Sequence, residues 1–414
     1  MGYPAWMAST QSRTYDIVAW GATGYTGKLV AAELRDRFGA PGSRGVNWAI
    51  AGRSKQKLEA VAASLGMEVP ILLADSTDPG SLHALAASTR VVITTVGPFS
   101  RYGTDLVAAC VESGTHYCDV TGEGPWVRKM IERFDEEARA KGLRIVSLCG
   151  YDSVPSDLLC RLLQDEVKKQ KGTYAQAVEG LVGPIRGRFS GGTIETMVAM
   201  IKTSGTDKAT KSQLRNPLSL CPERTDRGSI PNSDPLGLRR VNGGWTGPFI
   251  MGGINGAVIQ RTNQLLGSPW GRNFSYREST WCGRGVLGWF RAAGILGITV
   301  GLFGGLMVPP LRWVMRNTIL PKPGFGPSEA VRARGFFRQR ALDPASGISA
   351  EIAADFDPGY DATARMVVAC GSCLMEGTQA LPEISGVVTP GSAFGPLLVP
   401  KLQERGFTIS LSQG

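Results

Sequence analysis

Histidine is nearly absent from this chain, which has only His83 and His116 among its 414 residues. His83 stands in a stretch typical of a surface helix and His116 begins a predicted strand, so neither is expected to act as a catalytic base. The serine, histidine and aspartate order of hydrolase triads is not found, and no Tyr-x-x-x-Lys pair supplies the proton donor of short-chain dehydrogenases. The sequence therefore supplies neither a hydrolase triad nor a Tyr-Lys pair for acid or base catalysis.

Cysteine patterns typical of disulfides or metal sites are also lacking. The eight cysteines are spread over the chain, and no leader with an apolar run and a cleavage site precedes them, so we expect thiols in the cytoplasm. Cys370 and Cys373 form one Cys-x-x-Cys pair without a second ligand pair, and their small neighbours favour a packed helix over zinc. We predict no metal site.

Acidic residues are fewer than basic ones, 35 against 45, which gives a formal charge of +10. This charge favours anionic partners such as nucleotide phosphates, coenzyme A, acidic carrier proteins or anionic lipid. Nucleic acid is not expected, because no dense Lys/Arg run with interleaved aromatics occurs. The hydrophobic content of 43% predicts a folded protein, and the length predicts two domains.

Short apolar runs alternate with helix-like stretches over residues 15–150, a pattern typical of α/β proteins with a parallel sheet covered on both faces. Strands are predicted at 15–20, 46–51, 69–74, 90–96, 115–120 and 143–148, with helices at 25–37, 55–65, 80–87, 104–112 and 125–141. Six strands with five crossovers predict a doubly wound Rossmann domain over residues 13–160.

A second domain is predicted where the residue pattern changes, after a helix that runs from Asp157 to Lys168. Residues 175–357 contain longer alternating segments rich in Gly and Arg, with an extended insertion at 207–250. Residues 330–341 and 347–356 alternate well enough for a hairpin closed by "LDPASG".

The stretch "YDIVAWGATGYTGKLVAAEL" from Tyr15 to Leu34 carries the first chemical motif. Gly21, Gly24 and Gly27 lie between a predicted strand and a predicted helix. Glycines let the backbone approach a pyrophosphate while the N–H groups of the helix start face its negative charge. The motif predicts dinucleotide binding, with a purely structural turn as the alternative.

The residues at the end of the second predicted strand discriminate between NAD and NADP, and the chain reads "AGRSKQK" there. Arg53 can pair with a 2′-phosphate, Ser54 can donate to it, and Lys55 or Lys57 can add charge. NAD would find no carboxylate partner for its ribose here, so NADPH is predicted. The alternative is that these basic residues only form the solvent-exposed start of a helix and bind no cofactor. Asp75, at the end of the third strand, is expected on the adenine side.

Three further loops lie at the carboxyl edge of the predicted sheet, where nucleotides and active sites are found. In "TTVGPFSRYG", Gly97 and Pro98 predict a turn past the nicotinamide ribose, with a simple loop as the alternative. "GTHYCDVTGE" and "CGYDSVPSDL" place acids and hydroxyls at strand ends. Asp119 or Asp152 could equally cap helices, and capping is the favoured role for residues 156–157, a serine and an aspartate.

The stretch "RFSGGTIET" predicts a strand that runs through Gly191 and Gly192 into a helix starting near Thr193. Such a helix start could face an anionic or developing oxyanion group of the substrate. A tight turn between domains is the alternative interpretation.

Residues 292–311 form a run of twenty residues without a charge, flanked by Arg291 and Arg312. Roughly 20 apolar residues are long enough to cross a bilayer. Five glycines and Pro309–Pro310 equally suit a segment attached to a membrane or lipid-droplet surface, or a buried element of a substrate tunnel. All three interpretations remain open at this point.

Taken in order, "GATGYTGKLVAAEL", "AGRSKQKL", "TTVGPFSRYG", "GTHYCDVTGE", "CGYDSVPSDL" and "SGGTIET" resemble the saccharopine dehydrogenase-like oxidoreductases. The resemblance is strong over residues 14–200 and looser beyond, where "GYDATARMVVACG" is similar to the family's final helix. It implies a Rossmann domain and an α+β substrate domain, with residues 358–414 returning to the first. Family members include trans-acting enoyl reductases and lipid-droplet-associated proteins.

The resemblance implies NADPH contacts at the nucleotide motifs and leaves the general acid open. The implied cofactor residues are Gly21, Thr23, Gly24, Tyr25, Thr26, Gly27, Arg53, Ser54, Gly97 and Pro98, to which we add Asp75 and Phe99. Candidate catalytic residues are Tyr151, Asp152 and Tyr117, and candidate substrate contacts are Gly191, Gly192 and Thr193.

The leading hypothesis is an NADPH-dependent reductase of a conjugated carbon–carbon double bond in an acyl or polyketide chain, presented by a carrier protein or coenzyme A. An imine substrate, as in saccharopine formation, would instead need convergent cations such as Arg186, Arg188, Arg239 and Arg240. A third hypothesis is a nucleotide-binding protein on lipid surfaces without turnover. We expect the protein in the cytoplasm or on lipid droplets or a membrane surface.

Overall fold

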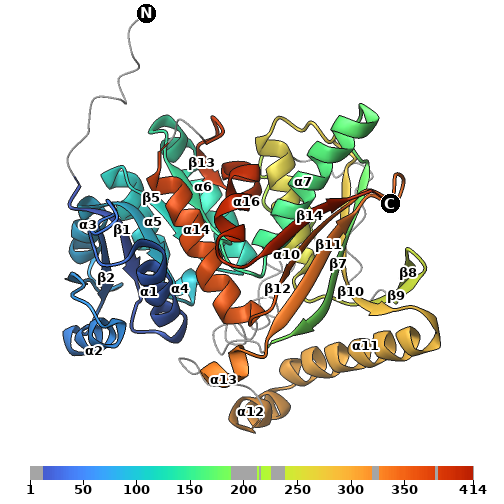
Figure 1. Ribbon diagram of the computed structural model, residues 1–414, viewed down its shortest axis with the longest axis horizontal. Coiled ribbons are helices and arrows are strands. Elements are labelled where there is room, and N and C mark those ends of the chain that lie inside the picture. The colour runs from blue at the N-terminus through green and yellow to red at the C-terminus, as the bar shows by residue number, and fades with distance from the viewer. Residues whose placement is uncertain are drawn as a thin grey trace, which may run out of the picture. The chain divides into compact units, whose positions relative to one another are not determined.

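The computed structural model describes residues 13–187, 212–213, 216–224, 238–318, 326–377 and 381–413 (Figure 1). The chain forms two compact units, each assembled from separate stretches of sequence. The first unit comprises Met1–Thr121, Lys129–Gly150 and Thr363–Leu398, and the second comprises Gly122–Arg128, Tyr151–Ala362 and Val399–Gly414.

The first unit contains a seven-stranded sheet in the order β13-β6-β5-β4-β1-β2-β3, in which all neighbouring strands pair in parallel. The strands are β1 (Tyr15–Trp20), β2 (Trp48–Gly52), β3 (Ile71–Leu73), β4 (Thr89–Thr94), β5 (His116–Asp119), β6 (Arg144–Val146) and β13 (Gly386–Val388). Strand order reverses between β1 and β4, as in a Rossmann sheet. The predicted doubly wound fold is confirmed.

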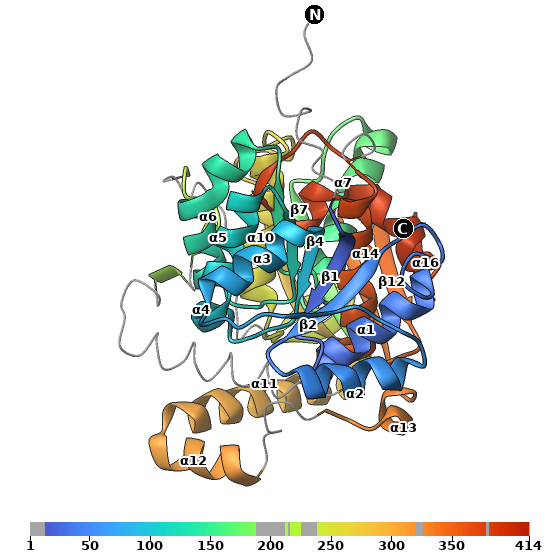
Figure 2. The same ribbon diagram turned by 90° about the vertical axis from the view of Figure 1, so that its left-hand side faces the viewer.

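Helices flank this sheet on both sides. They are α1 (Tyr25–Phe38), α2 (Lys55–Leu65), α3 (Pro79–Ser88), α4 (Phe99–Tyr102), α5 (Thr104–Ser113), α6 (Gly124–Ala140), α14 (Thr363–Met375) and α15 (Pro390–Ala393). Helix α1 contacts α14, whereas α3 contacts α5, and Figure 2 shows the two pairs on opposite sides of β1 and β2. The central strands are the core: the side chains of β1 and β4 residues such as Ile17 and Val92 have no exposed surface.

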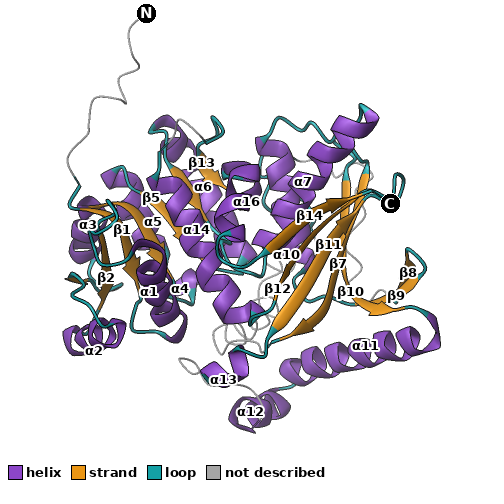
Figure 3. Cartoon of the chain, viewed as in Figure 1, coloured by secondary structure: helices purple, strands orange, loops and turns teal. Residues whose placement is uncertain are grey.

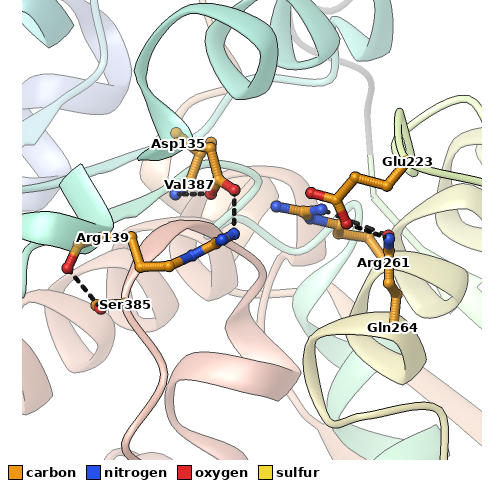
Figure 4. Close-up of polar contacts among 7 residues, drawn as sticks. All are labelled: Asp135, Arg139, Glu223, Arg261, Gln264, Ser385 and Val387. Atoms are coloured by element: carbon orange, nitrogen blue, oxygen red, sulfur yellow. Dashed lines mark hydrogen bonds and ion pairs between the residues drawn. The ribbon is translucent and has the colours of Figure 1, made fainter. Parts of the chain in front are cut away.

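Strand β13 is the one strand of this sheet that sequence patterning missed. It is fixed by Asp135 of α6, whose carboxylate accepts a hydrogen bond from the Val387 amide at 2.7 Å and pairs with Arg139 (Figure 4). Ser385 donates to the Arg139 carbonyl at 3.3 Å. A short strand from the C-terminal region is therefore held at the sheet edge by side chains of a helix far away in sequence.

The second unit is built on a mixed sheet in the order β14-β12-β11-β7-β10-β9-β8 (Figure 3). Its strands are β7 (Ala177–Arg186), β8 (Arg239–Val241), β9 (Gly244–Gly247), β10 (Ser275–Gly283), β11 (Phe336–Leu342), β12 (Ser349–Ala354) and β14 (Thr408–Ser412). Only β7 and β10 pair in parallel. This mixed sheet with helices matches the predicted α+β class.

The helices of this unit are α7 (Val154–Lys171), α10 (Gly252–Leu265), α11 (Gly285–Met307), α12 (Pro309–Thr318), α13 (Glu329–Arg332) and α16 (Leu398–Gln403). A short π-helix of this unit occupies Pro358–Ala362, and a 3-10 helix at Gly395–Leu397 belongs to the first unit. Helix α7 packs on β11 and β12, and α10 packs on β10.

The predicted hairpin forms, with Leu342 opposite Ser349, but its first strand begins later than expected. Residues 329–332 form α13 instead, because Ser328 precedes a run of good helix formers. In the predicted insertion, β8 and β9 form a hairpin through Asn242 and Gly243, at φ 45° and 75°. Asn-Gly is the sequence preferred by a two-residue turn of this kind.

Residues 292–311 lie in α11 and the start of α12. Only 17% of the most apolar window of α11 is buried, so the structure contradicts the interpretation of this segment as a buried tunnel element. By length and composition alone, α11 is the one helix among the described residues that could cross a membrane.

Candidate active site

The turn after β1 brings two stretches of backbone into close contact. Gly21 has φ 90° and its amide donates to the Ala51 carbonyl at 2.9 Å. A Cβ on Gly27 would lie 2.7 Å from the carbonyl carbon of Gly21 and closer still to its oxygen. Only glycine fits there, because any side chain would push α1 away from the strand.

The start of α1 is suited to an anion. Gly24 is the N-cap and provides no side-chain hydrogen bond, and the first helical turn contains no acidic residue. Tyr25 and Thr26 lie in this turn, Thr23 directly precedes the N-cap, and all three are partly exposed. The N–H groups and the positive end of the helix therefore favour a phosphate at this position.

The basic residues after β2 lie beside the end of β3. Asp75 accepts hydrogen bonds from the Thr77 amide and hydroxyl at 2.9 and 2.8 Å, and these bonds, with a further contribution from the Arg53 cation, lower the pKa of Asp75. Arg53 is exposed. Ser54 caps α2 by accepting from the Lys57 amide at 3.4 Å, which leaves its hydroxyl hydrogen free to donate.

The loop after β4 closes on the turn after β1. The Thr95 amide donates to the Trp20 carbonyl at 3.2 Å, and a Cβ on Gly21 would lie 2.6 Å from a methyl carbon of Val96. Next in the loop come the cis Gly97–Pro98 bond and Phe99, which is buried at the start of α4. The loops after β1 and β4 thus meet at the carboxyl edge, where the strand order reverses, and the chain after β2 leaves the sheet at the same edge.

These residues fit a dinucleotide with an extra phosphate. The glycine turn leaves no room for a Cβ, the α1 start carries no competing carboxylate, and the first turn of α2 holds Lys55 and Lys57 without an acid. Cations at a helix N-terminus are unfavourable unless an anion compensates them. NADPH would supply that anion through its 2′-phosphate.

Asp119 connects the ends of β5 and β6. Its carboxylate accepts hydrogen bonds from the Thr121 and Leu148 amides at 2.9 and 3.1 Å and from the Ser147 hydroxyl at 3.0 Å. Burial raises the pKa of Asp119 to about 6, although these bonds oppose the rise. Asp119 therefore supports both loops, and neighbouring Tyr117 is fully buried beside it.

Helix α7 begins at Val154, with Ser153 as its cap residue, so the capping predicted for Ser156 and Asp157 is wrong. Ser156 donates to Glu278 at 2.6 Å, and Asp157 accepts from Thr262 at 2.6 Å. The physical reason is the position of the proline at 155, which is tolerated in the first turn and allows the earlier start.

Sequence patterning missed a buried carboxylate, Glu278 of β10. It accepts hydrogen bonds from Ser156 at 2.6 Å, Tyr276 at 2.9 Å, Asn255 at 2.7 Å and Gln339 at 2.9 Å. Burial raises its pKa, although the bonds from Ser156, Asn255 and Tyr276 oppose the rise. The only sequence signal is the period of two, which places 276 and 278 on the same face of the strand.

Tyr151 lies in the same unit, and its ring packs edge-on against Phe337 at a centroid distance of 4.6 Å. Burial raises its pKa well above the ordinary value, and the carboxylates of Asp152, Glu278 and Asp357 raise it further. Burial also raises the pKa of Asp152 to about 6. Tyr151 is consequently neutral near pH 7 and retains its proton.

Two of the predicted substrate cations are already engaged. Arg239 makes two hydrogen bonds to Glu179, at 3.1 and 2.9 Å, and Arg240 lies over the Trp245 ring at 5.4 Å. Arg186 is exposed at the end of β7. The other predicted contacts, Arg188, Gly191, Gly192 and Thr193, lie outside the described residues.

All eight cysteines are free thiols and are buried. Within the described ranges, no group of three or more histidine, cysteine or acidic side chains is arranged to hold a metal ion. Cys370 and Cys373 are buried in α14, where a Cβ on the intervening Gly371 would lie 2.6 Å from Ile93 of β4.

Comparison with known proteins adds three findings. Residues 17–146 match the saccharopine dehydrogenase NADP binding domain. The chain is 37% identical to a provisionally named trans-acting enoyl reductase of Mycobacterium tuberculosis (strain ATCC 25618 / H37Rv), over 97% of this chain and 98% of that protein. It is 34% identical to a trans-acting enoyl reductase of Mycobacterium bovis (strain BCG / Pasteur 1173P2), over 98% and 99% respectively.

Among solved structures, apo saccharopine dehydrogenase (L-Glu forming) from Saccharomyces cerevisiae matches with a TM-score of 0.52. The match covers 96% of this chain and 100% of that one at 12% identity. At this level of identity the similarity shows a shared fold and nothing about the substrate.

Proposed function

The chain belongs to the saccharopine dehydrogenase-like oxidoreductases and is an NADP-dependent oxidoreductase, and from this premise we propose that it is a trans-acting enoyl reductase. Its substrate would be a carbon–carbon double bond conjugated to the carbonyl of an acyl or polyketide chain. The observation that carries the proposal is the 37% identity, over nearly the full length of both chains, to a protein named for this activity.

The first unit would hold the cofactor, which supplies a hydride for the β carbon of the substrate. The turn from Gly21 to Gly27 would hold the pyrophosphate against the α1 start, and Arg53 with Ser54 would bind the 2′-phosphate. The engaged state of Arg239 and Arg240 gives no support to an amino-acid dicarboxylate substrate. The excess of basic residues suits an acidic carrier protein or coenzyme A as the bearer of the acyl chain.

Reduction of an enoyl group also requires a proton for the α carbon, and we assign this role to Tyr151. Its raised pKa keeps the phenol protonated until a stronger base, such as the enolate, forms next to it. The predicted backbone donor at Thr193 is the further candidate for steadying the enolate oxygen.

The test measures NADPH oxidation by the purified protein with enoyl thioesters on coenzyme A and on a carrier protein. We expect oxidation with the enoyl substrate and none with its saturated counterpart. Tyr151→Phe should lower kcat by about 10²- to 10⁴-fold while NADPH affinity stays unchanged. Tyr174→Phe, which changes a tyrosine stacked under Lys168, is the matched control and should retain full activity. Full activity of Tyr151→Phe would remove it as the donor.

A further inference from the structure

Large apolar side chains gather on two helices of the second unit. Among the described residues, sixteen large hydrophobic side chains are exposed, and eleven of them lie on or between α11 and α12. We call these the α11–α12 surface: Val286, Leu287, Trp289, Phe290, Ile298, Val300, Met307, Val308, Leu311, Trp313 and Val314. Exposed apolar patches of this extent mark interaction sites on soluble proteins.

One side of α11 is attached to the sheet. Gly288 is buried, and a Cβ there would lie 2.7 Å from the carbonyl carbon of Gly283, while a Cβ on Gly247 of β9 would lie 3.3 Å from the Ala292 carbonyl oxygen. Helix α12 folds back below α11 (Figures 1 and 2), with Met315 in contact with Gly305. Exposed side chains therefore remain on the sides of α11 and α12 away from these contacts.

The stretch of sequence that contains this surface has charges of one sign. Residues 279–328 contain no Asp or Glu but have five cations: Arg284, Arg291, Arg312, Arg316 and Lys322. Arg284 and Arg291 are exposed, beside Leu287 and Phe290 in sequence. A second copy of the chain would bring the same positive charge to this surface, which disfavours a symmetric dimer, whereas anionic lipid headgroups are complementary to it.

Helix α11 is long enough to cross a bilayer, because 23 residues at about 1.5 Å each exceed the roughly 30 Å of hydrocarbon. Its packing on β9 and β10 instead keeps it beside a sheet, and Pro309 and Pro310 begin a second helix. Trp289, Phe290 and Trp313 are exposed aromatic side chains, the kind found at the boundary between headgroups and acyl chains. These features favour a position in the membrane interface over a span.

We propose that the α11–α12 surface docks on the face of an anionic phospholipid bilayer. The apolar side chains would enter the boundary between headgroups and acyl chains, and the arginines would pair with the lipid phosphates. This binding is independent of the proposed enoyl reduction, because it uses no residue assigned to the cofactor or to the proton transfer.

The test is flotation of the full-length protein with vesicles of phosphatidylcholine alone or mixed with phosphatidylglycerol. We expect flotation with the anionic vesicles, little with the neutral ones, and release by high salt. Replacement of three exposed side chains, Leu287→Ser, Phe290→Ser and Trp313→Ser, should weaken binding at least about tenfold. Arg284→Gln and Arg291→Gln should each weaken it roughly fivefold.

The matched control replaces two exposed leucines elsewhere, Leu73→Ser and Leu411→Ser, and should float as the unchanged protein does. NADPH affinity, measured for every variant, shows that each is folded. Three results would overturn the proposal: no flotation with anionic vesicles, a dimer in solution that the triple variant dissociates, or a membrane-bound protein that resists alkaline extraction as a spanning helix does.

Discussion

Gly27 and Gly256 are both buried glycines in helices, yet a methyl group would meet different surroundings at the two positions. At Gly27 it would collide with the backbone of Gly21, whereas at Gly256 in α10 nothing lies within 4 Å. We expect Gly27→Ala to lower NADPH affinity at least about tenfold and to lower the unfolding temperature. Gly256→Ala should leave NADPH binding unchanged and stabilise the helix by about 0.5–1 kcal/mol. Equal NADPH affinities in the two variants would show that the turn does not set the cofactor position.

His116 makes the free energy of unfolding depend on pH. Its Nδ1 accepts a hydrogen bond from the Arg144 amide at 3.1 Å, and burial, with the cations of Arg144 and Arg90, lowers its pKa to about 4. The unfolded chain takes up this proton near pH 6.5, so the contribution of His116 is complete above that pH and is lost as pH falls to 4. A shift of this size corresponds to about 3 kcal/mol.

We therefore expect thermal unfolding to shift to lower temperature between pH 6.5 and pH 4, and His116→Gln to reduce that shift, because glutamine keeps an acceptor but does not titrate. His83→Gln, at an exposed position of α3, is the control and should leave the pH dependence unchanged. The same pH dependence in all three proteins would rule out His116 as its source.

At the scale of elements, β13 depends on one carboxylate of α6. Asp135→Ala would leave the Val387 amide without its partner, and we expect a loss of about 1–3 kcal/mol in the free energy of unfolding. In this variant, hydrogen exchange at the Val387 amide should accelerate more than exchange at the amides of β1. Arg139→Ala removes only a half-exposed cation, so the expected loss is below about 1 kcal/mol. Unchanged exchange at Val387 in Asp135→Ala would contradict this role.

Elements with a strong local pattern could be predicted from the sequence, and those that depend on distant partners could not. Tyr15–Trp20 and Lys55–Leu65 occupy their predicted ranges, because apolar periodicity and caps are local signals. Strand β13 has only three residues and exists through its pairing with β6 and its bond to Asp135. The residues around 386–388 carry no local signal for contacts with such distant partners.

The candidate site likewise contains features that the sequence predicts and features that it does not. The glycine turn and the basic residues after β2 are contiguous motifs and could be identified from the sequence. Besides Tyr276 on the same strand, Glu278 contacts Ser156, Asn255 and Gln339. These three residues come from three different elements, so nothing in the sequence around 278 indicates them. The early start of α7 likewise went unrecognised, because both Ser153 and Ser156 are suitable cap residues.

At the scale of the whole molecule, neither unit is a continuous stretch of sequence. The predicted boundary near residue 160 falls within α7, whereas the units divide after Gly150, because α7 packs on β11 and β12. The C-terminal region was predicted to return to the Rossmann domain as one segment. It contributes α14 and β13 to the first unit and β14, paired with β12, to the second.

The protein as a whole is proposed to transfer a hydride to an enoyl chain, and isotope transfer measures this most directly. The unmodified protein is incubated with an enoyl thioester and NADPH carrying transferable deuterium at C4 of the nicotinamide, and the product is examined by mass spectrometry and NMR. Enoyl reduction predicts a saturated thioester with one deuterium at the β carbon and a solvent proton at the α carbon. Recovery of the enoyl thioester unchanged, with deuterium instead transferred to the carbon of an imine offered in parallel, would contradict it.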